Sequence, residues 1–123
     1  MPPIHRRFDL NDQTAFADLS GDHNPMHLDV QAARRLLLGG VAVHGIHLLL
    51  WALDRLVATG TTLPAVDSIR AHFDRPALLG EDIALQWQTS DGHVTVTAHN
   101  AVGRVMRLKL EARSVPDRPN SRA

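Results

Sequence analysis

An acid and an imidazole lie five residues apart in the stretch Phe16-Ala-Asp-Leu-Ser-Gly-Asp-His-Asn-Pro-Met-His27. These residues are Asp22 and His27, and on one unbroken helix their side chains would point about 140° apart. A helix is not expected to continue through them, because Gly21 permits unusual φ angles and Pro25 keeps the residue before it out of the α region. A kink here can bring Asp22 and His27 to one site.

Pro25 also suits the first position of a new helical turn, which places His27 near a helix N-terminus. The positive end of that dipole disfavours an imidazolium, so a neutral imidazole is expected near neutral pH. Asp22 and a neutral His27 that share one water would form a proton relay. The alternative is purely structural: residues 20–22 end a helix, Asn24-Pro25 form a turn, and the polar groups satisfy the backbone.

The composition bounds the class of protein. The 123 residues suffice for one domain with a hydrophobic core and are too few for two. Thirteen basic residues balance thirteen acidic ones, which argues against sequence-independent nucleic-acid binding. The absence of cysteine excludes disulfides, thiolate nucleophiles and thiolate metal ligands. No apolar run reaches the roughly 18 residues of a membrane span, and residues 1–7 lack the apolar core of a signal peptide, so a cytoplasmic location is expected.

Three helices are expected in the first half of the chain, after a short strand over 4–8. They run from Asn11 or Asp12 to Leu19, from a cap at Asp29 through 30–38 to Gly39-Gly40, and over 44–59 with a stop at Gly60. In the first, Phe16 and Leu19 should share one face. The third is apolar on nearly every side from Ile46 to Leu53, which predicts a buried helix.

Four later segments alternate apolar and polar residues with a period of two. Their apolar positions are Ile69, Ala71 and Phe73; Ile83, Leu85 and Trp87; Val94, Val96 and Ala98; and Met106, Leu108 and Leu110. The pattern predicts antiparallel strands with one buried face. Asp91-Gly92 indicates a hairpin, 100–103 a second turn and 76–82 a longer connection.

The order of elements predicts an α+β fold in which an antiparallel sheet curls around a central buried helix. We expect residues 1–113 to form this single domain. The segment 114–123 is rich in Pro, Asp, Asn and Ser, which indicates a disordered tail, or a linker if the chain belongs to a longer protein. A homodimer that extends the sheet is the simplest way to cover the helix and an open sheet edge.

The long motif around Asp22 and His27 resembles that of the MaoC-like dehydratases and (R)-specific enoyl-CoA hydratases, which have the hot-dog fold. The resemblance continues at Gly39-Gly40, Val43-His44-Gly45, 73–76 and 80–82, and spans roughly residues 8–112. It implies a hot-dog dimer that reversibly hydrates a trans-2-enoyl thioester to the (R)-3-hydroxyacyl thioester. No cofactor is implied beyond the coenzyme A or phosphopantetheine that the substrate carries.

The resemblance also implies roles for single residues. Asp22 and His27 would hold the water, one taking its proton and the other delivering a proton to the α-carbon; which does which stays open. The backbone N–H of Gly45 would bind the thioester oxygen, since an unpaired amide at a helix N-terminus attracts anions. Asn24 and His44 complete the expected substrate-binding residues, Asn24 by shaping the loop and His44 by satisfying nearby backbone.

Two departures from the family pattern leave the substrate open. The chain lacks the longer leading strand of many members, and bulky residues fill a helix face that is often lined with small ones: Leu48, Leu49, Leu50, Trp51 and Leu53. These could narrow the acyl tunnel, or mark one module of a larger enzyme that acts on an acyl-carrier protein. Four arginines are candidate phosphate contacts that the sequence cannot rank: Arg70, Arg75, Arg104 and Arg107.

Three alternatives to the hydratase are distinguishable. A hot-dog thioesterase would activate water against the thioester carbonyl, but this does not explain the paired Asp22 and His27. A non-catalytic hot-dog module would bind acyl chains or complete another subunit's sheet. A metal site could use His23 with His27, or His44 with His47, but no further ligand cluster accompanies them, so no metal is expected.

Overall fold

One antiparallel sheet with a helix along one face forms the body of the protein, as the computed structural model shows for residues 2–35, 40–60 and 65–112. The strands are β1 (Ile4–Arg6), β2 (Val66–Phe73), β3 (Ile83–Ser90), β4 (His93–His99) and β5 (Arg104–Ala112). Their order in the sheet is β1-β3-β4-β5-β2, so β1 and β2 are its edges. The expected α+β architecture is confirmed, whereas the segment 114–123 lies outside the described residues.

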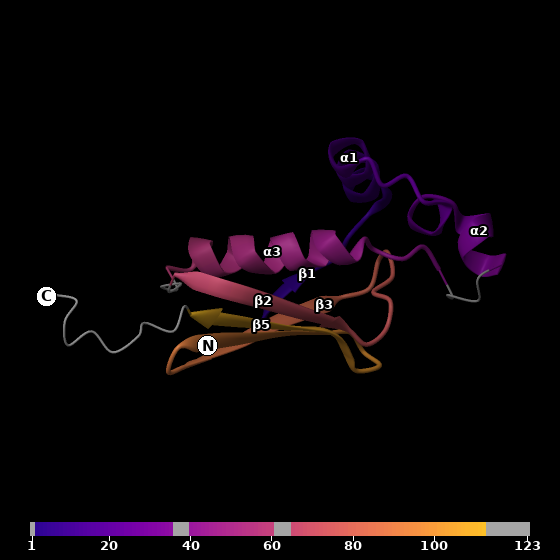
Figure 1. Ribbon diagram of the computed structural model, residues 1–123. Helices are drawn as coiled ribbons and strands as arrows, with labels where there is room; N and C mark the ends of the chain where they lie inside the picture. The colour runs from indigo at the N-terminus through magenta and orange to yellow at the C-terminus, as the bar shows by residue number, and fades with distance from the viewer. Residues whose placement is uncertain (1, 36–39, 61–64, 113–123) are drawn as a thin grey trace, which may run out of the picture.

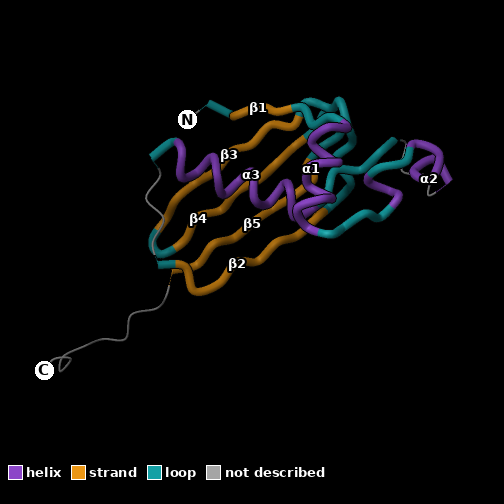
Figure 2. Tube along the Cα trace, turned by 90° about the horizontal axis from the view of Figure 1, so that it is seen from above, coloured by secondary structure: helices purple, strands orange, loops and turns teal. Residues whose placement is uncertain are grey.

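The helices divide into one long helix on the sheet and a group of short ones at its end. Helix α3 (Gly45–Ala58) runs across the sheet, while α1 (Leu10–Ser20) and α2 (Val30–Arg35) lie beyond the end where α3 begins (Figures 1 and 2). The 3₁₀ helix η1 (Pro25–His27) connects α1 to α2. This arrangement brings the loop after α1 to the N-terminus of α3.

Helix α1 begins earlier than the sequence indicated. Its N-cap is Asp9, and its Oδ1 accepts a hydrogen bond of 2.8 Å from the backbone N of Asp12. Asp12 returns a bond of 2.9 Å from its Oδ2 to the backbone N of Asp9, which completes a capping box. The prediction of Asn11 or Asp12 as the cap was therefore wrong. Leu19 is 81% exposed while Phe16 is buried, so the expected shared apolar face is also wrong.

Helix α2 has the predicted cap, because Asp29 Oδ1 accepts from the backbone N of Gln31 at 2.8 Å. Its predicted end at 36–39 lies outside the described residues. Helix α3 has the predicted bounds, with His44 as N-cap, Thr59 as C-cap and Gly60 at a positive φ of 77°. Among the described helices, none combines the length and hydrophobicity needed to cross a membrane.

The core fills the space between α3 and the sheet. It includes Leu48, Trp51, Ala52 and Leu56 of α3, and Ile83, Leu85, Val94, Val96, Met106 and Leu108 of the central strands. The predicted apolar faces of β3, β4 and β5 are thus confirmed. Both predicted turns are also present: Gly92 closes the β3–β4 hairpin at φ 77°, and Asn100 Oδ1 accepts from the backbone N of Val102 and Gly103 before β5.

One side of α3 and the edge strand β2 remain uncovered in the single chain. On α3, Ile46 is 56% and Leu50 46% exposed; on β2, Ile69 is 44% and Phe73 43% exposed. The prediction of a helix buried all round is confirmed only for the face toward the sheet. The predicted buried face of β2 is wrong for the single chain, because β2 is an edge strand with a neighbour on one side only.

Candidate active site

The loop between α1 and η1 carries the predicted kink. Gly21 ends α1 in the left-handed conformation at φ 81°, which a residue with a side chain rarely adopts. Asn24 caps η1, and its Oδ1 accepts a 3.1 Å bond from the backbone N of Met26. Pro25 is the first residue of η1, as expected. The break turns the chain sharply between Asp22 and His27.

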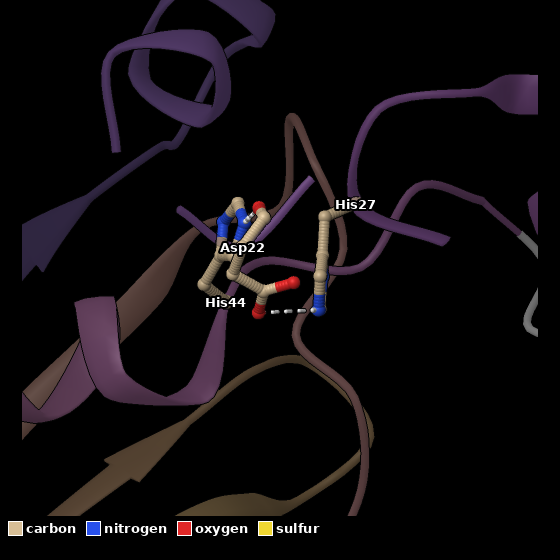
Figure 3. A group of neighbouring side chains, drawn as sticks. All are labelled: Asp22, His27 and His44. Atoms are coloured by element: carbon tan, nitrogen blue, oxygen red, sulfur yellow. Dashed lines mark hydrogen bonds and ion pairs between the residues drawn. The ribbon is translucent and has the colours of Figure 1, made fainter. Parts of the chain in front are cut away.

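Asp22 and His27 each use one side-chain atom for the backbone and turn the other toward the partner (Figure 3). Asp22 Oδ1 accepts from the backbone N of Asn24 at 3.1 Å, and His27 Nδ1 lies 2.7 Å from the carbonyl oxygen of Ala42. Asp22 Oδ2 lies 3.9 Å from His27 Nε2. This distance is too long for a hydrogen bond, and it leaves one oxygen atom able to contact both groups.

The tautomer of His27 follows from its neighbours. A carbonyl oxygen only accepts hydrogen bonds, so the proton of a neutral imidazole lies on Nδ1, which donates to Ala42. The lone pair is then on Nε2, the nitrogen that faces Asp22. The side chain of His27 is 8% exposed and that of Asp22 49%, so the imidazole is fixed and the carboxylate is open to solvent. A buried imidazole beside an accessible carboxyl group can exchange protons with a bound water.

His44 lies against this pair. Its Nε2 donates to the backbone carbonyl of Asp22 at 3.0 Å, and its ring stacks on His27 with centroids 4.1 Å apart. Phe16 of α1 also lies against His44, with ring centroids 4.9 Å apart, and stacks on His47 at 4.7 Å. Burial lowers the pKa of both His44 and His47 below the ordinary imidazole value. Both rings are therefore neutral near neutral pH, and His44 holds the backbone of Asp22 in place.

Gly45 opens α3, so its backbone N–H has no carbonyl in a preceding helical turn to bond to. Such a free donor at a helix N-terminus can bind an anionic oxygen. The ring of Phe73 lies directly over Gly45: a Cβ at this position would sit 3.1 Å from Phe73 Cζ. A side chain at Gly45 would require that ring to move by a few tenths of an ångström.

Two adjoining cavities meet at Gly45 and Phe73. One, of about 430 Å³, is also lined by His27, Leu48 and Arg75; the other, of about 230 Å³, is lined by Asp22, His44 and Ile46. A larger cavity of about 560 Å³ lies on the outer face of the sheet, among Arg70, His72, His93, Thr95, Arg107 and Lys109. We place the candidate site at the smaller cavities, because they contain the acid–base pair and the free N–H.

The comparisons with known proteins agree with this fold. The model of the MaoC like domain matches residues 3–108 of the chain. The chain belongs to this family. A search of curated protein sequences found no match.

Solved structures share the architecture of this MaoC-like domain. The (R)-hydratase from A. caviae involved in PHA biosynthesis is 22% identical, with a TM-score of 0.73 over 88% of this chain and 89% of that chain. R-hydratase PhaJ1 from Pseudomonas aeruginosa is 22% identical, with a TM-score of 0.65 over 89% and 76%. HtdX of Mycobacterium tuberculosis is 25% identical, with a TM-score of 0.76 over 90% of this chain and 48% of that one. The hot-dog fold is thereby established.

The structure separates the four arginines of the MaoC-like domain that the sequence could not rank. Arg75 lines the cavity that contains His27. Arg104 is paired with Asp74 at 2.7 Å, and its hydrogen bond holds the pKa of that carboxyl below its usual range. Arg70 and Arg107 line the cavity on the outer face of the sheet. Arg75 is therefore the arginine placed to meet a ligand in the candidate site.

The histidine pairs considered as metal ligands do not form as the spacing suggested. His23 points to Asp18, with 3.3 Å between Nε2 and Oδ1, and His47 stacks on Phe16. Asp22, His27 and His44 instead offer three ligand atoms within 4.8 Å of one another. Because one nitrogen of each of these imidazoles donates to a carbonyl, only the other could bind a cation. The expectation that the domain works without a metal stays a prediction.

Sequence reasoning missed two residues of the site. Phe73 was predicted only as a strand residue, although its ring covers Gly45. Gln13 of α1 was not singled out, yet it is fully buried and donates to the carbonyls of His27 and Ala42 at 2.9 and 2.7 Å. A polar residue three positions before the buried Phe16 was the one available signal, since it places Gln13 on the same helix face.

Proposed function

We propose that this MaoC-like domain is a hydro-lyase that hydrates trans-2-enoyl thioesters to (R)-3-hydroxyacyl thioesters and catalyses the reverse dehydration. The observation that carries the proposal is the pair Asp22 Oδ2 and His27 Nε2, 3.9 Å apart beside a free helix N-terminus. Family membership and the likeness to two (R)-hydratases support the same reaction.

The pair holds the water between Asp22 and His27. The water oxygen bonds to the β-carbon of the enoyl group while one member of the pair takes a proton from it. The other member, which enters the reaction with a proton on the atom that faces the water, gives that proton to the α-carbon, so the net addition is one molecule of water. The proton gained by one member can then pass to the other through the next bound water, which restores the starting state. This arrangement leaves both assignments of acid and base open.

The backbone N–H of Gly45 binds the thioester oxygen as negative charge develops on it during addition. His44 holds the Asp22 backbone beside this oxygen, and Asn24 holds the loop. Coenzyme A or phosphopantetheine enters as part of the substrate, with no separate cofactor. Arg75, which lines the His27 cavity, contacts an anionic group of the thioester carrier. Of the bulky α3 residues that could narrow the acyl tunnel, Leu48 lines this cavity, whereas Trp51 packs in the core against Phe8.

We propose that the active form is a homodimer joined at the β2 edges. This strand presents Ile69 and Phe73, and the adjacent side of α3 presents Ile46 and Leu50, all of them exposed in the single chain. Phe73 and Ile46 also line the cavity that contains Asp22. A second copy that covers these residues would wall the cavity and exclude water from it. An acyl-carrier protein or fused domains would be further partners if the thioester is not free CoA.

The test is the hydration of crotonyl-CoA, followed as the loss of enoyl absorbance. Asp22→Asn and His27→Ala should each lower kcat about 10²–10⁴-fold, the usual contribution of a proton-transfer group. The neighbouring Asp18 and His23 form a second, exposed acid–imidazole pair at 3.3 Å and supply matched controls. Asp18→Asn and His23→Ala should keep the wild-type rate, with folding of all variants checked by circular dichroism.

Other outcomes separate the alternatives. Release of free thiol would mean that the protein is a thioesterase. If neither hydration nor hydrolysis occurs with crotonyl-CoA, with longer enoyl thioesters or with carrier-bound ones, the protein is a non-catalytic module. Activity that survives both site substitutions would contradict the assignment of the pair. A chelator should leave the hydration rate unchanged. If the chelator instead abolishes the activity and added divalent metal restores it, Asp22, His27 and His44 hold a cation.

A further inference from the structure

Gln13 connects the two segments that carry the imidazole of His27 and its acceptor. The side chain projects from α1 into the protein and is fully buried. Its Nε2 donates to the carbonyl oxygen of His27 at 2.9 Å and to the carbonyl oxygen of Ala42 at 2.7 Å. The Ala42 carbonyl is the group that accepts from His27 Nδ1, also at 2.7 Å. One amide therefore binds both the backbone of His27 and the acceptor of its ring.

The orientation of the Gln13 amide is fixed by chemistry. Both neighbours are carbonyl oxygens, so the amide must present its NH₂ group, which has two hydrogens for two acceptors. Its own oxygen, Oε1, is buried without a hydrogen-bond partner among the described residues. A buried unpaired acceptor is costly, and the opposite orientation would set an oxygen against two oxygens. The two donated bonds thus decide how the side chain lies.

The Ala42 carbonyl is saturated by this arrangement. It has two lone pairs, one for Gln13 Nε2 and one for His27 Nδ1. The backbone N of Ala42 also donates to the carbonyl of Met26 at 3.0 Å, so residues 26 and 42 are held side by side. Without Gln13, the carbonyls of His27 and Ala42 each lose a buried donor, and the Ala42 carbonyl is then held only through its own peptide, whose Val43 N donates to the carbonyl of Ala77 at 2.7 Å.

We propose that Gln13 is a positioning residue that fixes the Nδ1–H tautomer and the orientation of the His27 imidazole through the Ala42 carbonyl. A free imidazole side chain favours the Nε2–H tautomer, so the opposite tautomer needs a fixed acceptor at Nδ1. Only the Nδ1–H form directs a lone pair toward Asp22. The consequence for catalysis rests on the proposed hydratase function, but the consequence for the tautomer does not.

The test uses the nitrogen-15 chemical shifts of the imidazoles above neutral pH, with His27 identified from the spectrum of His27→Ala. The wild type should show His27 as the Nδ1–H tautomer. Gln13→Met, which keeps the length and removes both donors, should move His27 toward the Nε2–H tautomer. With crotonyl-CoA it should lower kcat about 10–100-fold and leave KM unchanged, as expected when a catalytic group is misplaced but substrate binding is not.

Two controls separate positioning from loss of stability. Thr14→Ala removes the adjacent side-chain bond of α1, from Thr14 Oγ1 to the carbonyl of Leu10 at 3.0 Å, and Val94→Ala weakens the buried core at β4. Both should keep the His27 tautomer and kcat, even where the unfolding midpoint falls.

Two results would overturn the proposal. One is an Nε2–H tautomer of His27 in the wild type, which remains measurable if Gln13→Met does not fold. The other is a folded Gln13→Met protein with the wild-type tautomer. A wild type that lacks hydratase activity would contradict the proposed function. The role of Gln13 in fixing the His27 tautomer could still be tested by the nitrogen-15 chemical shifts.

Discussion

At the scale of the residue, Asp22 and His27 each use one polar side-chain atom to bind the backbone and direct the other toward the partner side chain. Asp22 Oδ1 and His27 Nδ1 bond to the backbone, while Asp22 Oδ2 and His27 Nε2 face each other. The structural interpretation of the motif is therefore confirmed for Asp22 Oδ1 and His27 Nδ1, while the proposed acid–base role concerns the other polar atom of each side chain. Pattern alone could not separate them, because a residue name does not say which of its atoms is engaged.

Stability should depend on pH through two of the stacked imidazoles. Burial lowers the pKa of His44 and His47 below the ordinary value of 6.5, so as pH falls below 6.5 the unfolded chain binds protons that the folded chain does not. Stability is thus greatest above this value and falls as pH is lowered through the window beneath it. The slope is at most about 1.4 kcal/mol per pH unit for each imidazole.

Urea unfolding between neutral pH and about pH 5 measures this slope. The hydrogen bond from Arg104 lowers the pKa of Asp74, so the protonation of Asp74 changes stability only at pH values below this window. His47→Met removes one buried imidazole and should reduce the slope. Leu48→Met changes a buried apolar residue of the same helix without removing an imidazole, so it serves as the control and should leave the slope unchanged. An unchanged slope in His47→Met would show that its burial does not couple to folding.

At the scale of the element, local signals predicted the break after α1, the hairpin at Gly92 and the bounds of α3. The start of α1 escaped prediction, because Asn11 and Asp12 follow Asp9 closely and each could also cap a helix. The reciprocal bonds between Asp9 and Asp12 decide the choice. Arg6 adds a bond of 3.0 Å to Asp12, so β1 takes part in placing the helix that carries Gln13.

The capping box of α1 should contribute measurably to stability. Asp9→Ala removes the acceptor for the backbone N of Asp12 and should lower the free energy of unfolding by about 1 kcal/mol. Denaturant unfolding gives this value directly. Asn11→Ala is the matched control, because Asn11 is exposed within the same turn and was the alternative cap. Equal losses in the two variants would mean that the box does not hold the helix start.

At the scale of the whole molecule, the uncovered side of α3 and the β2 edge lead us to predict a homodimer. Ile69→Asp places a charge on the exposed apolar face of β2 and should convert a dimer to a monomer. Crotonyl-CoA hydration should fall with it, since the cavity at Asp22 loses its proposed wall. Light scattering and the hydration assay measure the two effects.

The exposed Val102, in the turn between β4 and β5, supplies the control for this substitution. Val102→Asp adds the same charge at an apolar position that is 72% exposed, and it should leave both assembly and rate unchanged. A wild-type protein that is monomeric and fully active would contradict the proposed dimer.

The sequence by itself determined the features that depend on neighbours in the chain. The kink between Asp22 and His27, the glycine that opens α3 and the period-two strands all follow from backbone preferences within a few residues. The long motif also carried enough specificity to indicate the family and its fold. These features place the chemical groups on their elements.

Only the tertiary structure decided how those groups are oriented. The Ala42 carbonyl that fixes His27, the Gln13 amide that holds both and the Phe73 ring over Gly45 come from segments 14 to 29 residues away in the chain. The exposed side of α3 likewise depends on how far one sheet can reach around a helix. Such contacts arise from packing between distant segments, and no local preference encodes them.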